Sequence, residues 1–365
     1  MVDTRVERTK EHKLIDIIAI SIMAVISGAE GWVAIETYGK AKQSWLKEFL
    51  SLPNGIPSHD TFGRVWSIIS TEEFNKCFLN WLDTLVKKCG IDVVSIDGKT
   101  LKQSYDRSNS QSALHIVSAW SSSHKLVLGQ KKIDDKSNEI TAIPALIEML
   151  DIQDSIITID AMGCQKKIAS LLINKKADYV LGLKGNQGNI HKEVKAFFNK
   201  AKKQKFIGEV ADFYRTTEAG HGRIETRKIW AVSISELPGK YREKWAGLKT
   251  IVMVVSERRL WNKTTTGVRY YLSSLECNAR LLAEVIRSHW GIENELHWTL
   301  DVTFKEDASR IRKDRATENF ALLRRIALNL LNREDSYKAS KKMKRYRAAM
   351  DNDYLLSILA AGCVS

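Results

Sequence analysis

Two short apolar runs that each finish on an aspartate constrain this chain most. Val93–Ile96 precede Asp97 in "VVSID", and Ile156–Ile159 precede Asp160 in "IITID". Runs of this length, rich in β-branched residues, predict buried strands. If the two are neighbouring strands of one sheet, their ends emerge at the same edge, about 4.8 Å apart. Two carboxylates so placed would raise each other's pKa unless a cation lay between them. Each aspartate alone is also consistent with a residue that caps the loop after its strand.

The surrounding pattern predicts a mixed α/β domain over residues 92–335. Three strands, a helix, a strand, a helix and a strand follow one another, which is typical of a mixed sheet with flanking helices. Residues 200–275 alternate polar and apolar side chains, so we expect a β-rich insertion there. Helices are predicted over about 281–299 and 315–332, where they resume the α/β unit.

The two ends of the chain have a different character. Residues 1–91 predict a helical N-terminal domain, in which Ser58 is placed to cap a helix. Such a bundle either contacts DNA in the manner of a helix-turn-helix module or serves packing or dimerisation. Residues 336–365 are expected to form a basic C-terminal tail, because Lys338–Arg347 contain six basic residues and no acidic one.

The charge of the chain favours a polyanionic partner. Its 57 lysines and arginines exceed its 43 aspartates and glutamates, and its formal net charge at pH 7 is +14. Nucleic acid is the first candidate and an anionic membrane surface the second. The five cysteines lack CxxC pairing, so neither a disulfide framework nor a zinc site is indicated. The apolar segment 14–26 is shorter than the roughly 20 residues of a membrane span. We therefore expect a cytoplasmic protein of the bacterial cytosol or nucleoid.

A third carboxylate is expected from the predicted helix "EVIRSHWGIENELHWTLDV". Its apolar residues recur at three- and four-residue steps, and Glu293 falls within that stripe. Glu295 is about 200° further round and is expected to face solvent. A charge on the core face is costly unless it is paired or binds a metal, so Glu293 is the carboxylate that needs a partner. A salt bridge to a neighbouring Arg or Lys is the alternative, and Asp301 is a weaker contender.

Several ordered blocks of the sequence resemble a known family. They are "NGIPSHDTF", "SIDGKTLKQSYD", "DDKSNEITAIPALIEMLDI", "TIDAMGCQKKIA", "LKGNQGN", "GHGRIETR" and "HWGIENELHWTLDVTFKEDASRIRKD". In this order they resemble the H-repeat-associated, ISAs-type insertion-sequence transposases, which are DDE transposases. The likeness runs from "HKLIDIIAISIMAVISGAEGW" almost to the C-terminus. It implies an RNase H-like mixed sheet with flanking helices, a β-rich insertion and a helical N-terminal domain.

The resemblance implies that Asp97, Asp160 and Glu293 are the catalytic and metal-binding residues. Such a triad would hold two Mg²⁺ ions, or Mn²⁺ in their place, and would cleave phosphodiester bonds at transposon ends before strand transfer to target DNA. Broader relatives carry an Arg four residues before this Glu and a Lys seven after it. Here those positions hold His289 and Leu300. The phosphate contacts of that signature must therefore come from other residues, or are not made.

Basic side chains near the predicted site are the candidates for contacts with phosphates. Lys99 is either a phosphate contact or a partner for Asp97. Lys184 ends a predicted strand before the turn "GNQGN". Strand alternation in "GHGRIETR" places its charged residues on one face, which either follows a DNA backbone or neutralises itself. The predicted DNA-binding residues are Lys99, Lys184, His221, Arg223, Arg227, Arg310 and Arg312.

Three functions fit these features. A metal-dependent DNA transposase is the leading hypothesis. A nuclease on the same core that cuts without joining strands is the second, and a catalytically retired DNA-binding protein is the third. A homodimer on double-stranded DNA is expected for the first, because two DNA ends must be handled together.

Overall fold

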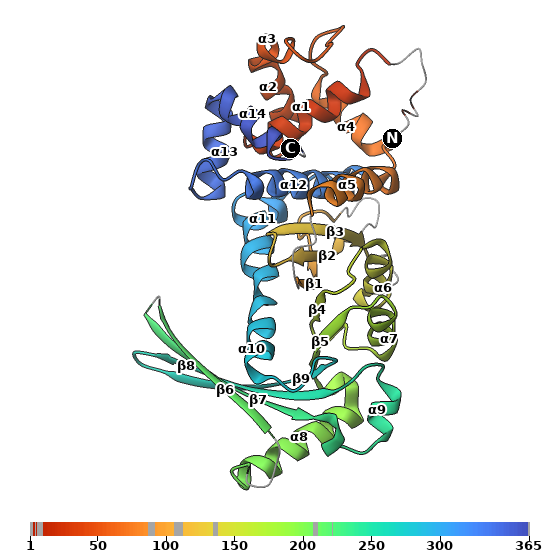
Figure 1. Cartoon of the computed structure of the whole chain (residues 1–365). Helices are drawn as coiled ribbons and strands as arrows, with labels where there is room; N and C mark the ends of the chain where they lie inside the picture. The colour runs from red at the N-terminus through yellow and green to blue at the C-terminus, as the bar shows by residue number, and fades with distance from the viewer. Residues whose placement is uncertain are drawn as a thin grey trace.

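The computed structural model describes residues 3, 5, 10–86, 92–105, 112–133, 138–206, 211–220 and 222–363. Figure 1 shows a helical end, a central sheet and, at the opposite end, a group of long strands that project from the body. None of the helices in these ranges combines the length and the apolar character that a membrane span requires.

In the described part of the chain, nine strands form one sheet in the order β3-β2-β1-β4-β5-β9-β8-β7-β6. Their bounds are β1 Val93–Thr100, β2 His115–Ser121, β3 Leu126–Lys132, β4 Ile156–Ile159, β5 Asp178–Leu183, β6 Ala211–Gly220, β7 Arg223–Ser233, β8 Thr250–Leu260 and β9 Thr264–Ser273. β1, β2 and β3 form an antiparallel meander, and β4 and β5 run parallel to β1. This order and these directions make the mixed sheet that the sequence pattern predicted, with the RNase H-like arrangement that the family resemblance implied.

Helices cover both faces of the parallel part of the sheet. α6 (Glu139–Met149) and α7 (Lys166–Asn174) share an apolar core with one face, and α10 (Ala279–Ser288) packs on the other. All four residues of β4 are buried. A strand covered on both sides is apolar along most of its length, which is why "IITI" shows no alternation of polar and apolar residues. Its one hydroxyl, that of Thr158, donates a hydrogen bond to Oγ of Ser95.

The predicted β-rich insertion continues the main sheet. It begins with α8 (Gly188–Lys203), contains β6 to β9 and the short α9 (Lys240–Lys244), and returns along β9. β9 pairs antiparallel with β5 from Ser273 opposite Val180 to Tyr270 opposite Leu183. Beyond Leu183, β9 runs on without β5 at its side. The end of β5 therefore leaves a step in the sheet.

The N-terminal helices pack on the end of the α/β domain. They are α1 (Leu14–Ile26), α2 (Trp32–Ala41), α3 (Gln43–Leu46), α4 (His59–Ile68) and α5 (Thr71–Leu85). α12 (Ala316–Arg333) is buried along most of its length and contributes to the same core as these helices. Ser58 caps α4 as predicted, accepting a hydrogen bond from the Thr61 N–H at 3.3 Å. These helices thus have a packing role, and a contact with DNA stays a prediction.

Residues 336–365 differ from the basic tail that the sequence suggested. They contain two helices, α13 (Lys341–Met350) and α14 (Asn352–Ala360), which pack back on α12. Lys344 and Arg345 are buried: Lys344 pairs with Glu334 at 2.8 Å, and Arg345 donates to the carbonyl oxygen of Val25 at 3.0 Å. Two of the basic residues of the expected tail are therefore buried and paired within the protein.

Candidate active site

The two predicted aspartates occupy equivalent positions on neighbouring strands. Ile96 of β1 lies opposite Ile159 of the parallel strand β4, and Asp97 and Asp160 are the next residues along each strand. β4 ends at Ile159, whereas β1 continues through Asp97, which pairs with Ser118 of β2. The parallel pairing therefore brings the two carboxylates to the carboxyl end of β4.

Asp160 also caps the loop after β4. Its Oδ1 accepts hydrogen bonds from the N–H of Met162 at 2.8 Å and from the N–H of Gly163 at 3.4 Å. The loop lies against β5 at Gly182, where a Cβ would be 3.1 Å from the backbone nitrogen of Ala161. The glycine therefore lets the loop, and Asp160 with it, lie close to β5.

Glu293 lies in a π-helical turn, Ile292–His297 (η4), which follows α10. Its predicted place on the buried face is wrong: Ile292 and Leu296 are buried, whereas Glu293 is exposed. The i→i+5 pattern of a π turn holds more residues per turn than an α-helix and so rotates the residues it contains. Glu293 consequently lines an open pocket, and Asp160 lines the same pocket.

The charges of these side chains act on one another. The pKa of Asp97 is raised to about 7, first by burial and then by the negative charges of Asp160, Glu139 and Glu293. The ordinary pKa of this carboxyl is near 4. Carboxylates that disfavour one another's ionisation in this way belong to one site, and a bound cation would relieve the repulsion.

The donor set has the chemistry of a site for a hard divalent cation, because Mg²⁺ prefers carboxylate oxygens. The uncompensated charge around Asp97 agrees with such a group. Among the residues that the structure describes, no three or more His, Cys, Asp or Glu side chains already form a group that could hold a metal ion. The carboxylates suit a hard cation by charge and ligand type, and the described side chains are not arranged as a complete coordination shell.

Glu139 is an acidic neighbour that the sequence analysis missed. It begins α6, and its carboxylate lies so close to the backbone of Gly98 that a Cβ there would overlap it. His115 of β2 holds this carboxylate, with Nε2 at 3.0 Å from Oε1. Only long-range geometry brings Glu139 beside the residue that follows Asp97, so no local pattern could have identified it.

Two histidines flank Glu293 at four-residue spacing. Nδ1 of His289 lies 2.9 Å from Oγ1 of Thr158, and that hydroxyl donates to Oγ of Ser95 at 3.0 Å. Because the hydroxyl proton is used there, Nδ1 of His289 is the donor and Nε2 is left as an acceptor. Burial lowers the pKa of His289, which favours this neutral form. His297 lies on the other side of Glu293, beside Asp97.

Lys99 has a role that the sequence did not predict. It is buried, and its ammonium pairs with Asp301, with Glu306 at 3.1 Å and with Asp307 at 3.4 Å. Nη1 of Arg325 in α12 lies 2.8 Å from Oε1 of Glu306. Asp301, the weaker contender for the third carboxylate, is thus a partner of Lys99. This cluster ties β1 to the segment that follows η4 and α11 (Trp298–Val302).

The predicted basic ladder on β7 is paired with acidic side chains. Arg223 lies 2.9 Å from Glu225, and Arg227 pairs with Glu225 and, at 3.1 Å, with Glu218. The alternative of a self-neutralising ladder therefore describes these arginines. His221, also predicted to bind DNA, lies outside the described residues.

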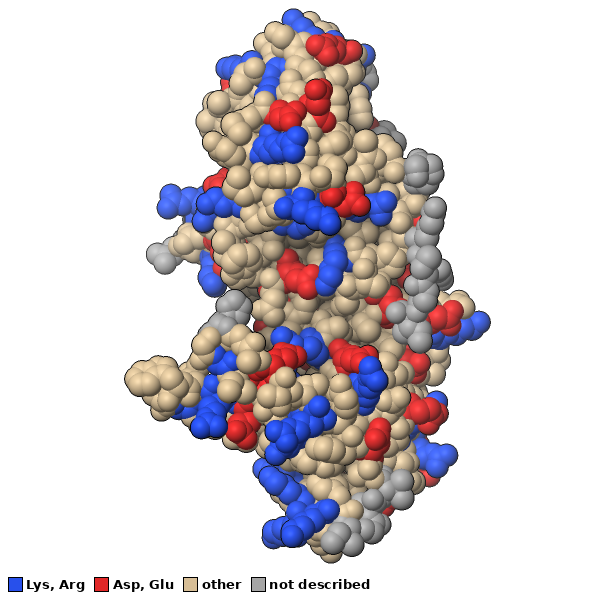
Figure 2. Space-filling model, turned by 60° about the vertical axis from the view of Figure 1, so that its left-hand side comes forward, with Lys and Arg blue, Asp and Glu red and all other residues tan. Residues whose placement is uncertain are grey.

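The remaining predicted DNA contacts lie in two places. Arg310 is exposed, and Arg312 donates from Nε to the carbonyl oxygen of Gln103 at 3.1 Å, with its guanidinium over the ring of Tyr105. Lys184 is exposed at the end of β5. Figure 2 shows one face of the molecule, on which basic side chains are interspersed with acidic ones.

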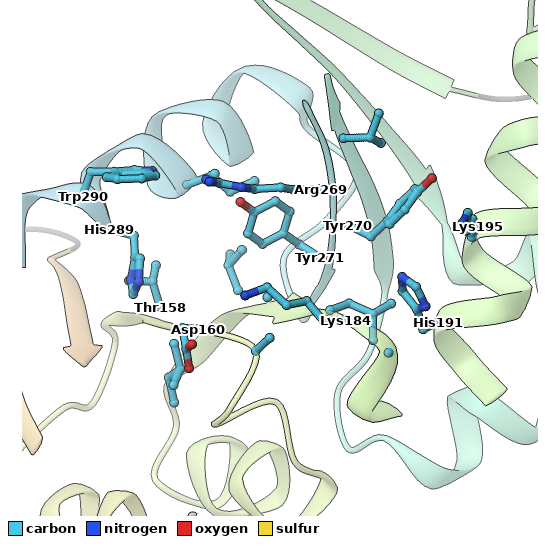
Figure 3. Close-up of a pocket in the computed structure, with 18 of the residues that line it drawn as sticks. Thr158, Asp160, Lys184, His191, Lys195, Arg269, Tyr270, Tyr271, His289 and Trp290 are labelled. Carbon is cyan, nitrogen blue, oxygen red and sulfur yellow. The ribbon is translucent and has the colours of Figure 1, made fainter. Parts of the chain in front are cut away.

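A pocket of about 670 Å³ adjoins the carboxylates at the step where β5 ends. Figure 3 shows Asp160 and His289 on one side of it, His191 and Lys195 on the other, and Lys184 between the two groups. Its complete lining is Thr158, Ile159, Asp160, Ala161, Val180, Gly182, Leu183, Lys184, Gly185, His191, Lys195, Asn199, Val268, Arg269, Tyr270, Tyr271, Ile286, His289, Trp290 and Glu293. Its size is that of a ligand pocket.

The chain is similar to known transposases along almost its whole length. "H repeat-associated putative transposase YhhI" of Escherichia coli (strain K12) is 44% identical over 359 residues, covering 97% of this chain and 94% of that protein. "Putative transposase YncI" of Escherichia coli O157:H7 is 42% identical over 362 residues, covering 98% and 92%. Among solved structures, a piggyBac transposase synaptic complex with hairpin DNA matches with a TM-score of 0.43 and 13% identity, covering 98% of this chain and 76% of that one.

Two protein families also match. Residues 1–82 match the family described as DDE_Tnp_1-associated, and residues 88–330 match the family described as Transposase DDE domain. The second match spans more than half of the chain, and both bacterial relatives are matched over more than nine-tenths of their length. This chain therefore belongs to the Transposase DDE domain family.

Proposed function

We propose that this protein is a DNA transposase that cleaves phosphodiester bonds at the ends of its element and joins the freed 3′-hydroxyl to target DNA. The observation that carries the proposal is the pairing of β1 with β4, which sets Asp97 beside Asp160 while the charge of Glu293 acts on Asp97. Asp160 and Glu293 in addition line the same open pocket.

Asp97, Asp160 and Glu293 are the residues that would hold two divalent cations, Mg²⁺ or Mn²⁺. When bound, such cations supply an activated water or 3′-hydroxyl and stabilise the leaving oxygen of an in-line displacement at phosphorus. The chain itself fixes the carboxylates: the loop hydrogen bonds hold Asp160, and His297 lies against Asp97. His289 lines the pocket, with Nδ1 2.9 Å from Oγ1 of Thr158.

The proposed substrate is double-stranded DNA, and we place the protein in the bacterial cytosol at the nucleoid. Lys184, Arg310 and Arg312 are proposed to contact phosphates. Arg223 and Arg227 would have to exchange carboxylate partners for phosphates to do so. Two transposon ends must be cut and joined together, so we propose that the protein acts as a homodimer on DNA.

The test is to mix the purified protein with a DNA fragment that carries the ends of its element, with and without Mg²⁺. Nicking and joined products that require Mg²⁺ support a transposase; nicking alone identifies a nuclease, and binding without cleavage a retired protein. Asp97→Asn should abolish cleavage and leave DNA binding nearly unchanged. The matched control is Asp353→Asn, at an exposed position of α14, which should cleave like the wild type. Full activity of Asp97→Asn would remove Asp97 from the site.

A further inference from the structure

We infer that Lys184, Lys195 and Arg269 form a phosphate-binding wall that holds the backbone of the DNA strand next to the bond that is cut. This inference rests on the proposed function, since it assigns the substrate's path at the same site. The three residues come from the end of β5, from α8 and from β9, and all line the pocket that Asp160 and Glu293 also line.

The position of the pocket favours a ligand that extends from the carboxylates. β5 ends at Leu183, opposite Tyr270, whereas β9 continues past it, and the pocket occupies this step. The carboxyl ends of β4 and β5 both lie there. Crevices at the carboxyl ends of parallel strands are where open α/β sheets bind their ligands. A strand held at the carboxylates can continue into the pocket.

One face of α8 points into the pocket. His191, Lys195 and Asn199 recur at four-residue steps, so they lie in a row along one side of the helix, and all three line the pocket. Figure 3 shows His191 and Lys195 reaching toward it from this helix, with Lys184 between them and Asp160. Lys192, one residue after His191, does not line the pocket.

The positive charges of this wall are not neutralised by the protein. Within the part of the chain that the structure describes, Lys184, Lys195 and Arg269 have no carboxylate within 4.0 Å, unlike Lys99 and Arg227. The carboxylates that line the same pocket are Asp160 and Glu293, the residues proposed to hold the divalent cations. Cations gathered without counterions attract an anionic ligand, and a DNA strand supplies phosphates in a row.

Arg269 is held in a form suited to a phosphate. Its guanidinium lies 5.2 Å from the ring centroid of Trp290, which is three residues before Glu293. Arg269 also makes a side-chain hydrogen bond with Tyr271. Because a guanidinium carries five N–H donors, others remain for a phosphate. Arg269 therefore links the wall to the helix that carries Glu293.

The test is the salt dependence of binding to a labelled single-stranded oligothymidylate, in EDTA so that no cleavage occurs. For a single strand, the slope of log K against log salt changes by about 0.7 for each phosphate contact. Lys184→Gln, Lys195→Gln and Arg269→Gln should each weaken binding several-fold and flatten the slope by about 0.7. Arg269→Lys should keep most of the slope because the charge remains. Lys192→Gln, an exposed site on the same helix as Lys195, is the matched control.

The inference is overturned if the three pocket variants bind like Lys192→Gln, or if Lys192→Gln weakens binding as much as they do. Its failure can be told apart from failure of the proposed function. If the wild type cleaves DNA with Mg²⁺ while the pocket variants bind normally, the proposed function stands and only the phosphate-binding wall is refuted. If the wild type never cleaves DNA, the proposed function is refuted. The binding measurement still tests whether the three residues form a phosphate-binding wall.

Discussion

The imidazole of His297 lies against the carboxylate of Asp97, with Nδ1 3.6 Å from Oδ2. His297 ends the π turn that carries Glu293, so this contact connects the helix-borne carboxylate to β1. Burial, together with the positive charges of Arg325 and Lys99, lowers the pKa of His297 to about 3. The ring is therefore neutral at neutral pH and can orient Asp97 without neutralising it.

His297→Phe should weaken the binding of divalent cations. The phenyl ring keeps most of the volume of the imidazole but presents no polar nitrogen to Asp97, whose Oδ2 lies 3.6 Å from Nδ1 of His297. Loss of a residue that orients a metal ligand typically costs about 10–100-fold in metal affinity, and we expect about tenfold. Calorimetric titration with Mn²⁺ measures the affinity directly. Glu295→Gln, on the same turn but paired with Lys125 at the surface, is the control; equal affinities for the two variants would contradict this role of His297.

Asp97→Asn should stabilise the cation-free protein, and increasingly so as the pH rises. The pKa of Asp97 is about 7 in the folded protein and near 4 when unfolded, so ionisation of Asp97 destabilises the fold. The stability that the protonated carboxyl provides is complete below about pH 4 and is lost as the pH rises through 7. The advantage of the variant should thus grow from pH 5 to pH 8, to roughly 4 kcal/mol at most, since one pKa unit is about 1.4 kcal/mol.

Thermal denaturation of both proteins in EDTA at several pH values measures this difference. Added Mg²⁺ should stabilise the wild type and so reduce the advantage of the variant at pH 8. A difference in stability that stays constant between pH 5 and pH 8 would mean that Asp97 titrates normally.

Local sequence patterns predicted which strands and helices carry the site residues better than they predicted the burial and the partners of those residues. Asp97 and Asp160 each follow the last residue of a pair, Ile96 and Ile159, on two neighbouring parallel strands. Residues that come directly after paired positions must lie close together, so the sequence pattern sufficed to predict this. Glu295 faces solvent as predicted and pairs with Lys125 at 2.7 Å. Glu293 was assigned to the wrong face because a 3.6-residue period does not apply inside a π turn. The partners of Lys99 begin some 200 residues away in sequence, which no local pattern reveals.

Glu139→Gln should lower the pKa of Asp97. The charge of Glu139 is one of the three that disfavour ionisation of Asp97, so its removal lets Asp97 ionise at a lower pH. In the Glu139→Gln background, the stability difference that Asp97→Asn makes should therefore level off at a lower pH, and at a smaller value, than in the otherwise unchanged protein. Glu148→Gln, at an exposed position near the other end of α6, is the matched control. If both glutamine variants leave the pH dependence unchanged, Glu139 does not act on Asp97.

Glu306→Gln should destabilise the protein strongly, because Glu306 is fully buried between two cations. Its carboxylate lies 3.1 Å from Nζ of Lys99 and 2.8 Å from Nη1 of Arg325. Removing one partner of a buried ion pair leaves an uncompensated charge and costs about 3–5 kcal/mol. Urea unfolding in EDTA measures the change in the free energy of unfolding. Lys102→Gln removes an exposed partner of Asp307 and should leave the free energy of unfolding nearly unchanged.

Lys99→Met combined with Glu306→Gln should be less destabilising than the sum of the two single changes. Each single change leaves a buried charge with fewer partners, and the double change removes one of the two cations that Glu306→Gln deprives of a partner. Residues that share an ion cluster show coupling energies of about 0.5–3 kcal/mol, whereas independent residues add. Strict additivity in the same urea measurement would mean that Lys99 and Glu306 contribute separately, and that their cluster does not join β1 to the segment after η4 as one unit.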